Sequence, residues 1–197
     1  MLKRIIFGLL LLGVVVAQTP SPRQYPIDTN HSTVGFSVSI MGGLSRVTGK
    51  FTDFAITLTN DEQDITKSSV SVVIKTISIN TGIAERDNHL RTADFFDAEK
   101  FPEITFQSSR IEKKGNQLIA FGTFTMHGVS KEIALPFTII GPNKNAAGNK
   151  MNFGYAMHVT LNRREFGINW QHKTVPNWVS DNVDVDIELI TKAIDVK

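Results

Sequence analysis

The feature that most constrains the fold is an alternation of apolar and polar residues with a period of two, which recurs along the chain. In residues 183–189, Val, Ile and Leu alternate strictly with Asp and Glu, and residues 151–161 alternate in the same way. Such a pattern gives a strand one apolar and one polar face. It predicts an all-β protein of about eight strands, each roughly nine to eleven residues long. The expected strands are 34–40, 47–59, 69–79, 103–111, 117–126, 132–140, 151–161 and 183–189.

Two segments depart from simple alternation. In residues 47–59 the apolar phase changes between Phe51 and Phe54, which predicts a bulge or bend near residues 49–53. Residues 83–93 have a helical composition and no alternation, so they predict a short helix. Eight strands with mostly short connections fit either an antiparallel barrel or a sandwich, and periodicity does not decide between them.

The N-terminal segment has the layout of a secretory signal peptide. Lys3 and Arg4 precede an unbroken apolar stretch, 5–16, and the small residue Ala17 follows. This stretch is shorter than the about 20 residues that a membrane span requires. We therefore expect a signal peptide at 1–17, a proline-containing linker at 18–26 and one domain at 27–193, in a periplasmic or secreted protein. The alternative is that the apolar stretch remains as an anchor.

Charge and composition exclude several classes of function. Without Lys3 and Arg4 the chain carries 19 basic and 19 acidic side chains. General nucleic-acid binding usually requires an excess of basic residues, which this neutral chain lacks. The sequence contains no Cys, so disulfides, a thiolate nucleophile and Cys-ligated metals are excluded. The five His residues are scattered, and none has the spacing of a metal site. We expect no metal and no cofactor.

Phenylalanine is the preferred aromatic residue, with 13 Phe against two Trp and two Tyr. These rings either fill the core or line an apolar cavity for a long hydrocarbon ligand. Charged residues gather in two non-strand segments, at 86–91 and 163–165. They either bind a polar head group or form structural Asp–Arg pairs that hold the helix against the rim.

Several motifs, in the right order, resemble the YceI-like family of exported bacterial lipid-binding proteins. They are Tyr25-Pro-Ile-Asp28, Val47-Thr-Gly49-Lys-Phe51, Arg86-Asp87-Asn-His89-Leu90-Arg91, Phe101-Pro102-Glu-Ile104-Thr-Phe106, His127-Gly128-Val129 and Arg164-Glu-Phe166-Gly167. The match runs from residue 25 to about 190. Thr123 and Met126 depart from the family pattern.

The resemblance implies an extended, eight-stranded, lipocalin-like antiparallel barrel with an elongated apolar lumen. It implies a non-enzymatic protein that holds a long-chain isoprenoid or lipid, such as a polyprenyl chain, an isoprenoid quinone or a fatty amide. The role would be transport, storage or sequestration, and some members form homodimers. The alternatives are an enzyme acting on a lipid head group and a ligand-free protein-interaction module.

The resemblance and the alternation together define the expected site. The expected lumen-lining residues are Phe36, Phe95, Phe96, Phe106, Phe124, Phe137, Phe153 and Phe166. The expected residues near the head group, at the mouth of the barrel, are Asp87, His89, Arg91 and Arg164.

Overall fold

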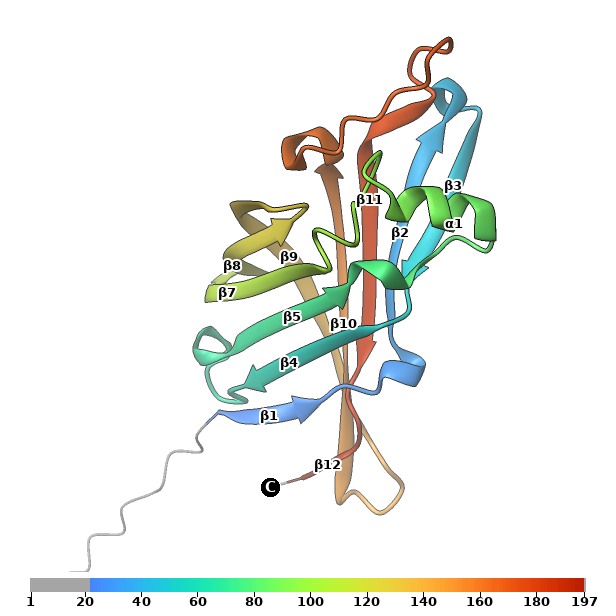
Figure 1. Ribbon diagram of the computed structural model, residues 1–197. Coiled ribbons are helices and arrows are strands. Elements are labelled where there is room, and N and C mark those ends of the chain that lie inside the picture. The colour runs from blue at the N-terminus through green and yellow to red at the C-terminus, as the bar shows by residue number, and fades with distance from the viewer. Residues whose placement is uncertain (1–21, 197) are drawn as a thin grey trace, which may run out of the picture.

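The strands form a single curled antiparallel sheet in the computed structural model, which describes residues 22–196 (Figure 1). The strands are β1 (Arg23–Pro26), β2 (Thr33–Ile40), β3 (Ser45–Phe51), β4 (Phe54–Asn60), β5 (Ser69–Lys75), β6 (Ile79–Asn80), β7 (Glu103–Lys114), β8 (Gln117–Met126), β9 (Val129–Lys144), β10 (Lys150–Asn162), β11 (Val179–Ile190) and β12 (Ile194–Asp195). The α-helix is α1 (Ala84–Arg91), and the 3-10 helices are η1 (Thr29–His31), η2 (Met41–Gly43), η3 (Ile65–Lys67), η4 (Thr76–Ser78) and η5 (Arg163–Phe166).

The sheet has the strand order β1-β4-β5-β7-β8-β9-β10-β11-β2-β3-β6, with β12 beside β10. Its register aligns the apolar faces of neighbouring strands. Val185 of β11 lies opposite both Phe36 of β2 and Val159 of β10. Residues two apart on a strand share a face, so the alternation seen in the sequence gives the whole sheet an apolar side and a polar side.

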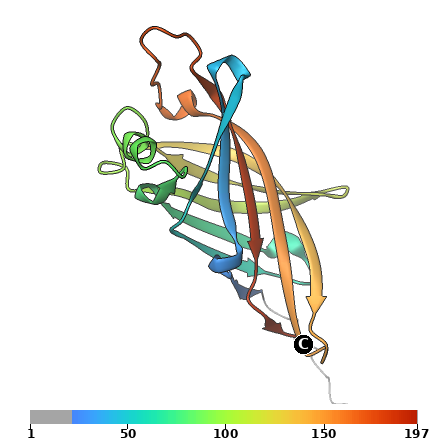
Figure 2. The ribbon, with the colours of Figure 1, turned by 90° about the vertical axis from the view of Figure 1, so that its right-hand side faces the viewer.

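Two chain segments connect the opposite ends of this strand order and curl the sheet. The first is the predicted bend, which lies at Thr52 and Asp53 between β3 and β4. The second passes from β5 through η4 to β6, which pairs with β3. The Thr52 amide donates a hydrogen bond to the Ser78 carbonyl (3.2 Å), and the Lys75 amide donates one to the Asp53 carbonyl (2.9 Å). The sheet therefore curls into a half-barrel around its apolar side (Figure 2).

The structure confirms an all-β, lipocalin-like fold with one short helix. The strand count differs from eight because residues 47–59 divide into β3 and β4, and because the short strands β1, β6 and β12 have too few residues to show a period. The helix α1 lies within the predicted range 83–93.

The N-terminal boundary of the domain differs from the expectation. The predicted signal peptide, 1–17, lies outside the described residues. Of the expected linker, residues 23–26 form strand β1, which pairs with β4 through contacts such as Tyr25 opposite Leu58. Tyr25 is only 1% exposed, so this segment belongs to the folded domain. Within residues 22–196, no helix is long and apolar enough to cross a membrane.

The assignment of strand faces can be tested with a pair of substitutions. Phe106 of β7 is 5% exposed and belongs to a buried cluster with Ile111 and Ala120. We expect Phe106→Asp to lower the free energy of unfolding by at least about 3 kcal/mol, because it removes a buried ring and buries a charge. Chemical denaturation measures this loss.

Asp186→Asn is the control, because Asp186 lies on the outer face of β11 and pairs with His158 there (2.6 Å). We expect its Tm to stay within about 2 °C of the wild-type value. A large drop for Asp186→Asn, or normal stability of Phe106→Asp, would mean that the faces are assigned backwards.

Candidate binding lumen

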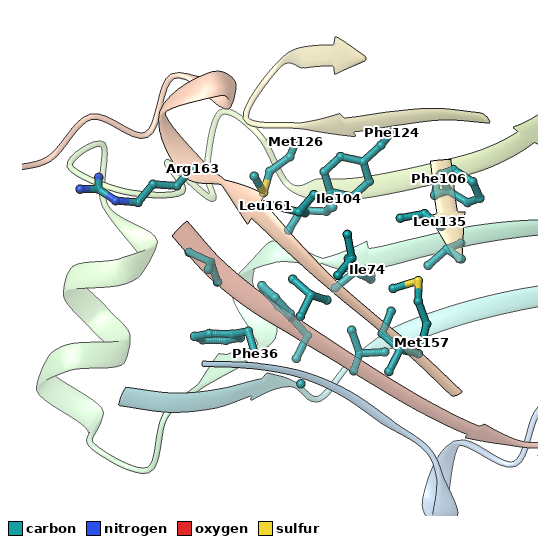
Figure 3. Close-up of a pocket in the computed structure, with 18 of the residues that line it drawn as sticks. Phe36, Ile74, Ile104, Phe106, Phe124, Met126, Leu135, Met157, Leu161 and Arg163 are labelled. Carbon is teal, nitrogen blue, oxygen red and sulfur yellow. The ribbon is translucent and has the colours of Figure 1, made fainter. Parts of the chain in front are cut away.

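The apolar side of the curled sheet encloses a cavity of about 480 Å³, here called the lumen (Figure 3). Its volume falls in the range of about 300–1,000 Å³ that is typical of ligand pockets. The lining residues alternate along the strands, as Val34, Phe36, Val38 and Ile40 do on β2. The inward face of each strand is therefore the one that the sequence periodicity identified.

The lumen is hollow rather than filled by its own side chains. Val38, Val72 and Val185 face the lumen, yet all three remain partly accessible to solvent. In a close-packed core, inward-facing valines would be fully buried. The interior therefore has room for a guest, and the alternative of a solidly packed barrel does not hold.

Almost all of the lumen surface is hydrocarbon. The lining side chains that carry nitrogen or oxygen are Arg86, His89, Thr105, Tyr155, Arg163, Trp170 and Trp178. The others are aliphatic side chains, Phe, Met and Gly. Such a surface binds by removing apolar area from water, and only a few positions can impose polar specificity.

Six of the eight predicted Phe residues line the lumen: Phe36, Phe95, Phe96, Phe106, Phe124 and Phe137. Phe153 does not line it and packs instead against Tyr25, with ring centroids 5.3 Å apart. Phe153 packs against the same buried cluster as Tyr155, two residues along β10, so it lies on the apolar side of the sheet, as alternation predicts, but outside the lumen.

Phe166 does not line the lumen either. It lies in η5, outside any strand, where alternation cannot indicate its direction. Its ring is 2% exposed and meets Phe124 edge to face, with centroids 5.3 Å apart. Phe166 therefore packs against the lining residue Phe124 without lining the lumen itself.

One end of the lumen is bordered by Arg86, His89 and Leu90 of α1 and by Trp170 and Trp178 of the loop before β11. We call this end the mouth. The opposite end is filled by a buried cluster of Tyr25, Ile27, Leu58 and Tyr155, of which only Leu58 and Tyr155 line the lumen.

Tyr155 brings a polar atom to the filled end of the lumen. Its hydroxyl is buried and has no hydrogen-bond partner among the described residues. Burial raises the pKa of Tyr155 well above its ordinary value, so the phenol stays neutral. Tyr25, in the same cluster, donates a hydrogen bond to Glu62 (2.6 Å).

Of the four predicted mouth residues, His89 is the one that lines the lumen. Its Nε2 atom is hydrogen-bonded to Asp94 (2.8 Å). Its ring meets Phe95 and Trp170 edge to face, with centroids 5.1 and 5.7 Å away. His89 therefore forms part of an aromatic group at the mouth.

Asp87 and Arg91 hold α1 in place and do not face the lumen. The buried Asp87 carboxylate accepts hydrogen bonds from the amide (2.8 Å) and the hydroxyl (2.5 Å) of Thr81. Arg91 donates to the carbonyls of Ile77 and Ile79, both at 2.9 Å. These bonds tie α1 to η4 and β6. The role of the two residues is structural, but their partners are Thr81 and backbone carbonyls rather than the expected Asp–Arg pair.

Arg163 and Arg164 also have structural partners. The Arg163 side chain is 6% exposed and donates to the carbonyls of Ile168 (2.7 Å) and Ser180 (3.0 Å) and to Asp181 (3.1 Å). Burial lowers the pKa of Arg163, and Asp181 opposes that effect. Arg164 does not line the lumen and donates to the same carboxylate (2.6 Å).

Sequence reasoning missed Trp170 and Trp178 as lining residues. Both lie in a segment without periodicity, so alternation gave no direction for their side chains. The available signal was compositional, because these are the two Trp residues of a Phe-rich chain and lie eight residues apart. Arg86 was among the charged residues of the helix and does line the mouth, where it donates to the Thr81 hydroxyl (2.7 Å) and carbonyl (2.9 Å).

Asp87 and His89, the acid–base candidates of the enzyme alternative, have separate partners. Asp87 is bonded to Thr81 and His89 to Asp94, so the two side chains do not converge on a common point in the lumen. A general acid–base pair would have to lie within hydrogen-bonding reach of one substrate. Among residues 22–196, no three acidic or His side chains are grouped so that they could hold a metal ion.

The fold and the lumen together define a lipocalin-like β protein with an internal apolar cavity. Residues 25–191 match the YceI-like domain, so the chain belongs to this family. A UPF0312 protein of Shewanella sp. (strain ANA-3) is 32% identical over 190 residues, which cover 95% of this chain and 96% of that protein. The resemblance noted in the sequence is confirmed.

Two solved structures have the same fold. The crystal structure of Burkholderia cenocepacia BcnA superposes with a TM-score of 0.74 at 22% identity, and the match covers 84% of this chain and 99% of that one. A polyisoprenoid binding domain from Saccharophagus degradans superposes with a TM-score of 0.63 at 17% identity, covering 86% and 98% of the two chains.

Substitutions of the two neighbouring arginines test whether Arg163 stabilises the loops at the mouth. We expect Arg163→Leu to lower the free energy of unfolding by about 3 kcal/mol, because buried carbonyls lose their charged donor and Asp181 keeps only Arg164. Arg164→Gln is the control and should cost less than about 1 kcal/mol, because Arg164 is partly exposed. Thermal denaturation compares them, and equal losses would contradict this assignment.

Proposed function

We propose that this protein is an exported binding protein that holds a long-chain isoprenoid or another amphiphilic lipid in its lumen. The observation that carries the proposal is the hollow lumen, which is lined by hydrocarbon over the length of the strands and bordered by a few polar groups at the mouth. Transport, storage and sequestration of the lipid all require such a site.

The length of the lumen favours a chain-like ligand. Lining residues on β11 run from Val179 to Leu189, and a strand rises about 3.3 Å per residue, so the lumen extends about 30 Å along this strand. Each methylene buried in it contributes about 0.8 kcal/mol before the costs of association. A long apolar chain therefore gains more here than a compact ligand of equal polarity.

The polar end of the ligand is best placed at the mouth. Arg86 and His89 are lining residues there whose side chains carry polar nitrogens. Arg86 is bonded to one backbone carbonyl, that of Thr81, whereas Arg163 is bonded to three. A polyprenyl chain, an isoprenoid quinone or a fatty amide would leave a small polar group at this position. The Saccharophagus degradans domain, described as polyisoprenoid binding, supports this class of ligand by its similar fold.

Export is proposed from the sequence. Lys3, Arg4 and the apolar stretch 5–16 have the layout of a signal peptide, with cleavage after Ala17 into the periplasm. The neutral charge balance of the remaining chain fits a free binding protein. A homodimer stays a prediction.

Organic extraction and native mass spectrometry of the purified mature protein test the function. We expect a co-purified lipid, or uptake of an added polyprenol or isoprenoid quinone at one molecule per chain. A protein that is empty and takes up neither ligand would contradict the proposal.

A pair of tryptophan substitutions on adjacent residues tests whether the ligand lies in the lumen. Val185 faces the lumen and Asp186 faces outward on the same strand. We expect Val185→Trp to reduce ligand uptake at least about tenfold, because the indole occupies the space of the ligand, with Tm retained. Asp186→Trp should leave uptake unchanged, and equal uptake by both variants would place the ligand elsewhere.

A further inference from the structure

Two loops form a projection next to the mouth, here called the tip: residues 41–44, between β2 and β3, and residues 171–178, before β11. They are joined by backbone hydrogen bonds from Met41 to the Trp178 carbonyl (2.8 Å) and from Gly42 to the Asn177 carbonyl (3.4 Å). Figures 1 and 2 both show the two loops side by side, projecting beyond the rest of the sheet.

The tip presents apolar side chains to solvent. Leu44 is 83% exposed, Met41 43% and Val175 36%. A single exposed apolar residue on a surface is ordinary, but here three of them share one projection. A Cβ added at Gly42 or Gly43 would meet no other atom within 4 Å, so the space around the tip is open.

The tip itself carries basic charge. Residues 41–44 and 171–178 contain Lys173 and no Asp or Glu. Lys173 has no ion pair among the described residues, whereas Arg46, next to the tip, is paired with Asp184. Basic residues near apolar ones complement a bilayer with anionic lipid head groups.

The tip is continuous with the lumen. Trp178 belongs to the tip and also lines the lumen, and the residues on either side of the two loops, Ile40 and Val179, line it as well. An apolar surface therefore runs from the projecting side chains to the mouth. Trp is also a side chain that suits the boundary between water and lipid.

The shape of the tip favours a lipid surface over a protein partner. The tip comprises 12 residues, 41–44 and 171–178, whereas a stable protein interface uses about 20–30 residues from each partner. A bilayer accepts a few inserted apolar side chains, and basic residues add to their affinity.

We propose that the tip docks on a bilayer that contains anionic lipids, inserts Leu44, Met41 and Val175, and brings the mouth to the membrane. The identity of the cargo rests on the proposed function, but the docking does not. Transfer of a lipid between membrane and lumen would then avoid passage through water.

The test is co-sedimentation of the mature protein with vesicles of phosphatidylcholine and phosphatidylglycerol at low ionic strength. We expect wild-type protein to bind, and Leu44→Asp and Val175→Asp each to weaken binding at least about tenfold. Ile140→Asp is the matched control, because Ile140 is 58% exposed but lies on β9, outside the tip; it should bind as wild type does. Pure phosphatidylcholine vesicles should bind less protein.

Several outcomes would overturn the docking proposal. They are wild-type protein that does not bind vesicles, Leu44→Asp that binds as well as wild type, and equal loss in Ile140→Asp. A wild-type dimer that Leu44→Asp converts to a monomer would make the tip a self-association surface instead.

Uptake of a polyprenol from detergent solution separates the docking from the proposed function. Leu44→Asp should keep this uptake and its Tm, because the side chain lies outside the lumen. Uptake without vesicle binding would refute the docking alone, and vesicle binding without uptake would refute the binding function alone.

Discussion

The continuous backbone hydrogen-bond ladder of the curled sheet is the interaction on which the rest of the structure depends. Because the lumen is hollow, side-chain packing across the middle cannot hold the strands at their separation. The ladder runs without interruption from β1 through β11 and β2 to β6, and dense clusters form at the two ends of the molecule. Backbone pairing fixes the shape, so the inward side chains remain available to line a cavity.

The alternation of apolar and polar residues predicted the long strands and their inward faces. It did not predict the side-chain positions outside the alternating segments. Strands β10 and β11 match the expected ranges 151–161 and 183–189 to within a few residues, because alternation records the two faces of a sheet directly. Phe153 faces the predicted side but packs with Tyr25 outside the lumen, because the extent of the cavity along a strand depends on tertiary packing that no local pattern shows. Trp170 and Trp178 lie in an aperiodic loop, and their place at the mouth results from tertiary contacts.

The roles of the charged residues were the least predictable part of the site. Their positions outside the strands indicated that they lie near one end of the sheet. The sequence left open whether each side chain binds a ligand or stabilises the fold. Hydrogen bonding decided between these roles: Asp87, Arg91 and Arg163 have their polar atoms engaged by the loops around them. The mouth is consequently built by charged residues but presents few of their charges to the lumen.

The partly exposed valines inside the lumen have a thermodynamic consequence. A guest chain in contact with Val38, Val72 and Val185 would bury apolar surface that folding alone leaves accessible. The bound chain would thus complete the hydrophobic core, although it belongs to another molecule and can dissociate. Binding to the folded state alone adds about 2.7 kcal/mol of stability at a ligand concentration 100 times Kd. The free energy of unfolding would therefore be higher for the ligand-bound protein than for the empty one.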